Sequence, residues 1–136
     1  MYPEYLVAPM RQELTSAGFQ DLKTAEEVDQ AIKAEGTVLV MVNSVCGCAA
    51  ANARPAARIS TQNEKHPDRF ITVFAGMEKE AVDQARAHML PYPPSSPAIA
   101  LFKDGKLVHM IERHQIEGRP AQMIADNLSQ AFDQYC

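Results

Sequence analysis

The chain carries two nearly uninterrupted apolar runs. Thr37–Val42 is apolar after its first residue, and Phe70–Ala75 is broken only by Thr72. Runs of this length without an apolar–polar alternation are typical of strands that are buried on both faces of a sheet. We therefore expect both runs to be central strands.

Three shorter stretches indicate further strands. Ala98–Phe102 and Leu107–Ile111 are joined by Lys103–Lys106. Within that link, Asp104-Gly105 supplies the residues of a tight turn, so we expect a β-hairpin. Phe19–Leu22 is brief and predicts an edge strand.

Apolar residues at helical spacing predict five helices. Thr24 and Glu27 form a capping box. Pro55 is expected to kink its helix because it removes one backbone hydrogen bond. Leu90–Pro97 is too rich in proline to be helical and is predicted to be a rigid connection. The expected helices are Pro9–Gly18 (after an irregular Met1–Ala8), Thr24–Gly36, about Cys46–Lys65, Glu78–Met89, and Pro120 to the C-terminus.

Strands and helices alternate along most of the chain, which implies parallel pairing of the strands. The hairpin near the end adds two antiparallel strands at one side of the sheet. The sequence therefore predicts a three-layer α/β fold, with a mixed central sheet flanked by helices and a C-terminal hairpin and helix. A length of 136 residues fits one domain, residues 1–136.

Composition narrows the class of protein. The formal net charge is −4 and no basic block is present, so nothing indicates a nucleic-acid surface. The sequence has no charged-then-apolar leader and no apolar run approaching about 18 residues, from which we expect a soluble, cytoplasmic protein without membrane association. Three cysteines are few and odd in number, which argues for reactive or metal-binding thiols in a reducing compartment.

Cys46 and Cys48 lie where the first buried strand passes into a helix. A helix N-terminus presents unpaired N–H groups and the positive end of the helix dipole, both of which favour an anion. These conditions lower the pKa of a cysteine and populate its nucleophilic thiolate. The pair is therefore a candidate redox site.

The spacing of the pair restricts its geometry. Two helical residues two positions apart point about 200° away from each other. The thiols can meet only if Cys46 lies at or before the helix cap, and we expect Gly47 to supply the backbone freedom. A disulfide across so small a ring should be strained and easily reduced. Ser44 could donate a hydrogen bond to the thiolate, or could serve only as a turn residue at the helix start.

The order of elements, with a cysteine pair after the second strand, resembles the thioredoxin fold. The segment Ser96–Gly105 is similar to the part of thioredoxins in which a cis-proline precedes the hairpin. The resemblance implies that Pro97 is cis and faces the cysteines, with Ser96 beside it. Because proline has no N–H, an extended client segment could pair with the backbone at this point.

A closer resemblance covers nearly the whole chain. The motif Asn43–Ala49, which contains Cys-Gly-Cys after an Asn-Ser lead, and the Pro-Pro-Ser-Ser-Pro run at 93–97 are similar to the bacilliredoxin family. Further similarity lies in Met1–Glu4, Pro9–Arg11, Glu26–Val28 and Pro55. Ordinary thioredoxins differ from this sequence: Val45 replaces a tryptophan, and Thr37–Val42 lacks an acidic residue.

The resemblance implies a thiol–disulfide oxidoreductase that removes bacillithiol, a low-molecular-weight thiol, from S-thiolated proteins. Weak disulfide reductase or isomerase activity accompanies this function in the family. In this reading Cys46 is the nucleophile, and Cys48 or a second small thiol resolves the adduct. The implied partners are S-thiolated client proteins, the small thiol as co-substrate and a disulfide reductase. No cofactor is implied.

Two other functions compete with this one. Cys46, Cys48 and Cys136 could hold a soft metal or an iron–sulfur cluster, although no second Cys or His pair accompanies them. The pair could also be a redox sensor without turnover. Cys136 is either an unused terminal thiol or a third redox thiol that reaches Cys46 or another subunit. Arg54 and Arg58 could attract the carboxylates of bacillithiol or could be solvated charges.

Overall fold

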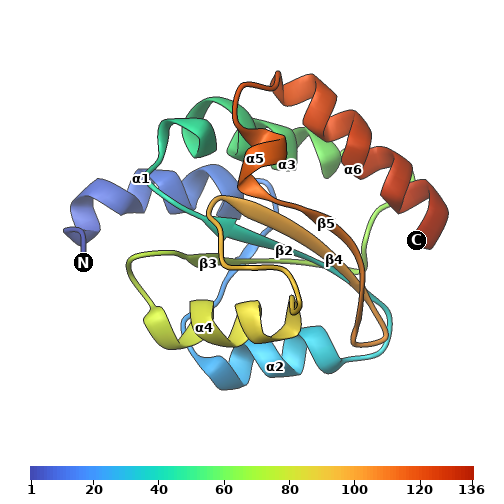
Figure 1. The fold of residues 1–136 in the computed structure, drawn as a ribbon, viewed down its shortest axis with the longest axis horizontal. Helices are drawn as coiled ribbons and strands as arrows, with labels where there is room; N and C mark the ends of the chain where they lie inside the picture. Colours follow the sequence, from blue (N-terminus) through green and yellow to red (C-terminus); the bar gives the residue numbers. More distant parts are fainter.

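The computed structural model describes residues 1–136 as a five-stranded sheet with helices on both faces (Figure 1). The strands are ordered β1-β3-β2-β4-β5 across the sheet. β1, β3 and β2 are parallel, whereas β4 pairs antiparallel with β2, and β5 with β4. The predicted mixed sheet and C-terminal hairpin are confirmed. The strand bounds are β1 Gln20–Asp21, β2 Thr37–Asn43, β3 Arg69–Phe74, β4 Ala98–Lys103 and β5 Lys106–Ile111.

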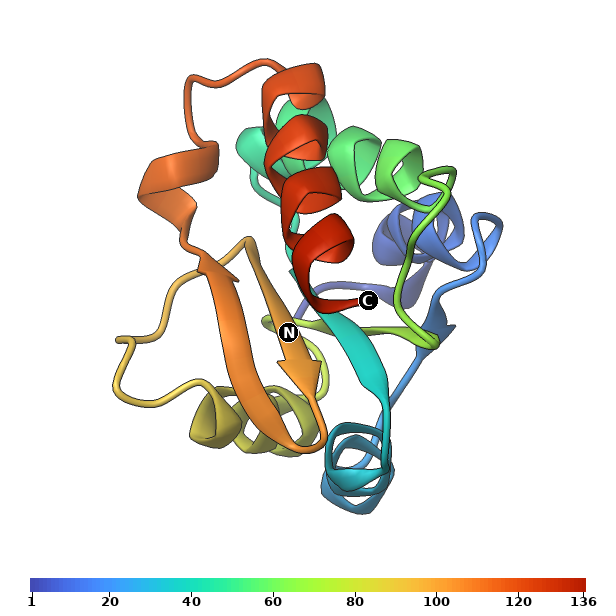
Figure 2. The same ribbon diagram turned by 90° about the vertical axis from the view of Figure 1, so that its right-hand side faces the viewer.

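Helices form the two outer layers. α2 and α4 cover one face of the sheet, while α1, α3 and α6 lie over the other (Figures 1 and 2). The helix bounds are α1 Glu4–Thr15, α2 Ala25–Lys33, a π-helical turn η1 Ala49–Ala53, α3 Arg54–Ser60, α4 Lys79–His88, α5 Arg113–Ile116 and α6 Ala121–Tyr135.

β2 is central because both of its faces are apolar. All seven of its residues are buried. Leu39 and Met41 contribute to the core under α3 and α6, whereas Val38, Val40 and Val42 contribute to the core against α2 and α4. Successive side chains of a strand point to opposite faces, so an unbroken apolar run supplies both cores. The strand ends at the same edge of the sheet as β3, its parallel neighbour.

The N-terminal helix begins earlier than the sequence predicts. Pro3, not Pro9, is its N-cap, and Pro9 lies inside the helix. The expectation of an irregular segment before residue 9 was therefore wrong. Arg11 explains the difference, since its Nε donates to Glu4 at 3.2 Å and ties the first turn to the rest of the helix. This contact within the helix, between residues seven positions apart, outweighs the preference of proline for the first helical position.

The helix after β2 also departs from prediction. It ends at Ser60 instead of near Lys65. Pro55 is preceded by the π-helical turn η1, in which the N–H of Arg54 bonds to the carbonyl of Ala49. A π turn inside an α-helix holds one extra residue. The chain thus accommodates Pro55 by widening the turn before it.

The remaining local predictions agree with the structure except for one element. The capping box of Thr24 and Glu27 is present, and Asp104 and Gly105 both have positive φ in the hairpin turn. The short helix α5, between β5 and α6, was not predicted. The Leu90–Pro91 and Ser96–Pro97 peptide bonds are both cis, the second as the resemblance implies.

Candidate active site

The cysteine pair lies at the carboxyl end of β2. Asn43 is the last residue of the strand, and the helix begins at Gly47, directly after Cys46. Cys46 is half-buried, whereas the residue Cys48 is only 9% exposed. Both thiols are free. The pair therefore has one accessible and one enclosed sulfur.

Backbone hydrogen bonds fix the first cysteine at the helix start. The N–H of Cys48 points to the Sγ of Cys46 at 3.4 Å, and the N–H of Ala50 donates to the carbonyl of Cys46 at 3.1 Å. The Oγ of Ser44 accepts from the N–H of Cys46 at 3.3 Å. Ser44 thus caps the turn, and no hydrogen bond from its hydroxyl to the thiolate is formed.

The environment separates the pKa values of the two thiols. The pKa of Cys46 is lowered, first by a hydrogen bond from the Cys48 side chain, and further by the N–H of Cys48 and the charge of Arg113. The pKa of Cys48 is raised, first by burial and then by its pairing with Cys46. A thiolate is the attacking form in exchange reactions, so Cys46 has the properties of a nucleophile.

A groove of about 320 Å³ opens beside Cys46. It is formed by the loop after β2, the turn after β3, the residue before the cis-proline, the start of α5 and the N-terminal segment. Ser96 lines the groove, whereas Pro97 is buried behind it. The lining residues are Tyr2, Ser44, Val45, Cys46, Ala75, Gly76, Ser96 and Arg113.

Arg113 is the functional residue that sequence reasoning missed. Its Nη1 donates to the carbonyl of Ser96 at 3.3 Å, and its Nε lies 3.6 Å from a carboxylate oxygen of Glu117. The pKa of Arg113 is raised, chiefly by the negative charge of Cys46. It belongs to the unpredicted helix α5, which is far from the motif in sequence, so no local pattern revealed it.

Arg54 occupies a different place from the one expected. It is only 2% exposed, and its Nη1 donates to the Oδ1 of Asn43 at 3.1 Å and to the carbonyl of Ser44 at 2.8 Å. Its Nε is 3.1 Å from a carboxylate oxygen of Glu13, but that N–H is not aimed at the oxygen. Because α3 is not an exposed helix here, Arg54 supports the loop from beneath and is not a solvated charge.

Arg58 also faces away from the groove. It is exposed, and its Nη1 donates to the backbone carbonyl of Glu13 and to the Oγ of Ser16. These contacts attach α3 to α1. Neither Arg54 nor Arg58 lines the groove, so the alternative in which they attract carboxylates to the cysteines is wrong.

Gly47 does not supply the backbone freedom that we expected of it. Its φ is not positive, and a Cβ built on it meets no atom within 4 Å. The thiols approach instead because Cys46 precedes the helix and Cys48 lies in its first turn. The open space above Gly47 leaves the motif accessible from outside.

Cys136 lies at the other end of β2. Cys136 is exposed as a residue, and loss of solvation at its thiol is the first cause of a raised pKa, against which Thr37, the first residue of β2, acts in the opposite direction. Seven residues of strand span about 20 Å. Cys136 therefore does not reach Cys46 within one chain, and the three cysteines do not form one ligand set. No group of three or more His, Cys, Asp or Glu residues is arranged to hold a metal ion.

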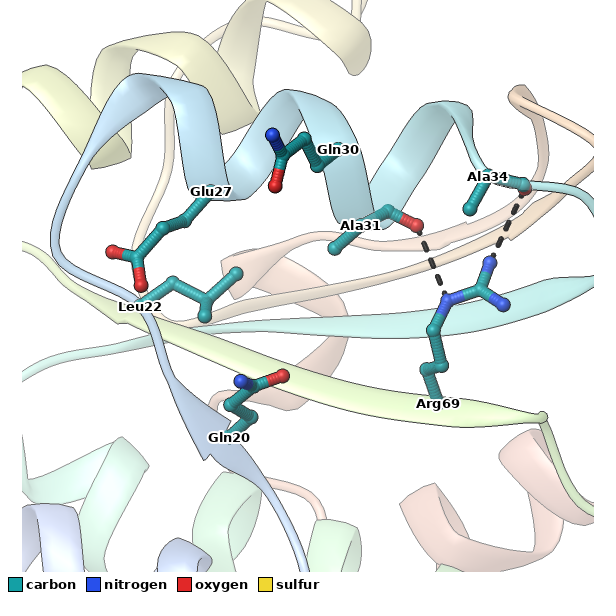
Figure 3. Close-up of a pocket in the computed structure, with 7 residues that line it drawn as sticks. All are labelled: Gln20, Leu22, Glu27, Gln30, Ala31, Ala34 and Arg69. Carbon is teal, nitrogen blue, oxygen red and sulfur yellow. Dashed lines mark hydrogen bonds between the residues drawn. The ribbon is translucent and has the colours of Figure 1, made fainter.

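A second hollow, of about 270 Å³, lies at the other side of the sheet and contains no thiol (Figure 3). Arg69 projects into it from β3 and donates to the carbonyls of Ala31, Ala34 and Glu35 at the end of α2. Basic side chains commonly satisfy the last carbonyls of a helix in this way. Arg69 is therefore a capping residue of α2.

Comparison with known proteins places these features in a family. The model of a family described as disulphide isomerase matches residues 2–136. A bacilliredoxin of Cytophaga hutchinsonii is 58% identical over 134 residues, which cover 98% of this chain and 99% of the relative. The chain belongs to the bacilliredoxin family. A bacilliredoxin of Halalkalibacterium halodurans is 52% identical over 136 residues, covering 99% and 94% of the two chains. A thiol–disulfide oxidoreductase is thus the activity class of this bacilliredoxin.

Solved structures confirm the fold of this bacilliredoxin. A thioredoxin variant of Halobacterium salinarum superposes with a TM-score of 0.61 at 17% identity, covering 88% of this chain and 91% of the other. A thioredoxin of Trypanosoma brucei brucei gives the same TM-score and identity, with 87% and 90% covered. The predicted thioredoxin-like α/β fold is therefore correct. None of its helices has the length and apolar character needed to span a membrane.

Proposed function

We propose that this bacilliredoxin removes bacillithiol from S-bacillithiolated proteins by thiol–disulfide exchange, with Cys46 as the attacking thiolate. The observation that carries the proposal is the asymmetry of the pair: Cys46 is accessible, lines a groove and has a lowered pKa, whereas Cys48 is enclosed and has a raised pKa. Family membership supplies the substrate class. Residues 1–136 act as one domain in this proposal.

In the first step, the sulfur of Cys46 attacks the bacillithiol sulfur of the mixed disulfide. A bond forms between Cys46 and bacillithiol, and the disulfide bond to the client breaks. The client leaves as a thiolate, which takes a proton from solvent when its pKa is above the pH of the solution. Attack at this sulfur, and not at the client's, suits a groove of about 320 Å³, which holds a small thiol better than a protein segment.

In the second step, the adduct on Cys46 is resolved in one of two ways. The thiolate of Cys48 can attack the sulfur of Cys46, which releases bacillithiol and forms a Cys46–Cys48 disulfide. Alternatively, a second bacillithiol attacks the adduct and leaves as bacillithiol disulfide. Once Cys46 is in a disulfide it no longer raises the pKa of Cys48, which favours resolution by Cys48. The first route requires a disulfide reductase to restore the dithiol, which fits a reducing cytoplasm.

The backbone around Ser96 and Pro97 is the proposed contact for an extended client segment. Ser96 lines the groove beside Cys46, and the open space above Gly47 lets a client approach from the helix side. Both positions flank the sulfur that attacks. The client would therefore lie across the groove while its small thiol occupies it.

Intact mass spectrometry tests the assignment of the two cysteines. The reduced protein, Cys46→Ala and Cys48→Ala are each incubated with one S-bacillithiolated client. We expect Cys48→Ala to gain one bacillithiol and Cys46→Ala to gain none, while the wild-type protein loses two hydrogens if Cys48 resolves the adduct. If neither variant is modified and the client keeps its bacillithiol, the proposed reaction is wrong. A gain by Cys46→Ala instead reverses the roles.

A further inference from the structure

Arg113 is the one charged residue among those that line the groove beside Cys46. No carboxylate shares the lining with it. The chain as a whole carries a formal charge of −4, so the charge of this side chain is opposite in sign to the net charge of the protein. A single cation at the edge of a groove selects ligands by charge.

Two other arginines near the active-site edge of the sheet are buried and bound to protein groups. Arg11 is bound by the carboxylates of Glu4, Asp21 and Glu78, and it is buried. Arg54 is buried beneath the loop and donates to two oxygens. Neither side chain lines the groove, so neither reaches a ligand there.

Arg113, in contrast, has N–H donors that no protein group uses. A guanidinium has five N–H donors in a planar fork. Only the Nη1–Ser96 hydrogen bond, at 3.3 Å, uses one of them within the protein, and the ion pair with Glu117 is long at 3.6 Å. The side chain is 43% exposed. Its Nη2 is therefore available for a planar anion such as a carboxylate, which arginine binds through two parallel hydrogen bonds.

The reaction itself changes the charge that faces Arg113. In the dithiol state, the guanidinium is attracted chiefly by the Cys46 sulfur. When Cys46 forms a mixed disulfide, that negative charge disappears, and of the two charges only the carboxylate of Glu117, at 3.6 Å, remains near the guanidinium. An anionic group on the attached small thiol can then replace the thiolate, at a site within reach of the same sulfur.

From this arrangement we propose that Arg113 is a specificity residue, which binds a carboxylate of the small thiol and makes the groove prefer anionic thiol adducts over neutral or cationic ones. The proposal rests on the proposed exchange function and names its recognition element. Bacillithiol meets the requirement through the carboxylates of its malate group. Glu117 limits the effect because it competes for the same guanidinium.

A charge series of adducts on one client separates recognition from chemistry. The client carries bacillithiol (anionic), β-mercaptoethanol (neutral) or cysteamine (cationic) on the same cysteine, and the rate of client release is measured for each. Dividing the bacillithiol rate by the β-mercaptoethanol rate in every variant cancels any change in the nucleophilicity of Cys46. The ratio relative to wild type then reports charge recognition alone.

We expect Arg113→Gln to lower this ratio about fivefold, as removal of one partly exposed ion pair does. Arg113→Lys, which keeps the charge but not the planar fork, should retain part of the preference. Glu117→Gln should raise the ratio, and cysteamine should show the opposite trend to bacillithiol in each variant. Arg119→Gln, which removes an exposed positive charge outside the groove, is the matched control and should leave the ratio unchanged.

If Arg113→Gln slows all three adducts equally, Arg113 only supports the thiolate or the Ser96 loop, and the specificity role is overturned. An unchanged rate for all three overturns it as well. Failure of the exchange function gives a different result, because wild-type protein would then not release the client from its bacillithiol adduct at all. The two failures are therefore distinguishable in one data set.

Discussion

A cysteine lies near each end of β2, but the pKa values of the two thiols are shifted in opposite directions. At the carboxyl end, Cys46 has N–H donors and the cation of Arg113 around its sulfur, and its pKa is lowered. At the other end, where the C-terminus of the chain lies beside β2 (Figure 2), Cys136 is exposed as a residue, and loss of solvation at its thiol is the first cause of a raised pKa. The donors and the cation around Cys46 outweigh the effect of burial on its pKa, whereas at Cys136 the effects of Thr37 and Lys103 do not, so the residue type alone does not set the pKa of a thiol.

The largest effect is expected from removing each of the two thiols in turn. Cys46→Ala should slow release of bacillithiol from a client by at least about a thousandfold, because a nucleophile has been removed. Cys136→Ala should leave the rate within about twofold, since its thiol is about 20 Å away along β2. Single-turnover rates with one S-bacillithiolated client measure both. A large loss in Cys136→Ala would show that this thiol takes part, for example through a second copy of the chain.

The next effect concerns the polar networks that hold the two ends. Arg54→Met leaves the carbonyl of Ser44 without its buried donor, and we expect a loss of about 2–4 kcal/mol in the free energy of unfolding. Thr37→Val removes hydrogen bonds with Asp68 at the other end and should cost about 1 kcal/mol. Urea denaturation measures both.

Arg58→Met is the control for Arg54→Met, because Arg58 is an exposed arginine of the same helix. Its loss should cost less than about 1 kcal/mol. Equal losses for the two arginine variants would contradict the supporting role of Arg54 beneath the loop.

A pH dependence sharpens the contrast between the thiols. A lowered pKa means that Cys46 is a thiolate at lower pH than an ordinary cysteine, so its alkylation by iodoacetamide should reach its plateau earlier. Cys48→Ala removes the first cause of the lowering, and the midpoint should move to higher pH. The backbone N–H groups of residues 48 and 49 and the charge of Arg113 still lower the pKa of Cys46 in this variant. The midpoint of Cys46 should be unchanged in Cys136→Ser, and a shift there would contradict the separation of the two ends.

The smallest effect is expected at Gly47. Gly47→Ala requires no positive φ and meets no neighbour, so the free energy of unfolding should rise by about 0.5 kcal/mol through helix propensity. Alkylation of Cys46 by a small reagent should be unchanged, whereas release of a folded client should slow if its backbone passes over this position. A loss of stability would show that the motif needs glycine for its conformation.

Local signals in the sequence predicted most of the fold. The buried runs of β2 and β3, the capping box at Thr24 and the turn at Asp104 depend on neighbouring residues, and all are present. The predicted start of α1 was wrong because the observed start depends on a contact between Arg11 and Glu4. The preference of proline for the first helical position, on which the prediction at Pro9 was based, does not reveal that contact.

The site was predicted only in part for the same reason. Cys46 and Cys48 follow from their place at a strand–helix junction, and the structure supports their different roles. Arg113 lies in the groove because α5 and the packing of the C-terminal segment place it there. The residue spacing around the Cys-Gly-Cys motif does not predict this placement. Neither alternative considered for Arg54 is correct, because α3 packs between α1 and α6 and buries its side chain.

The widened turn at Ala49–Ala53 sets a limit on engineering the motif. Each residue added to or taken from a helix rotates the remainder of that helix by about 100°. If the extra residue of η1 were deleted, Cys48 would rotate relative to Arg54, and the sulfur pair would no longer sit above its buried support. The Cys-Gly-Cys sequence therefore cannot be transferred alone into an ordinary thioredoxin helix. A working graft has to include the whole segment from Asn43 to Pro55 without a change in its length.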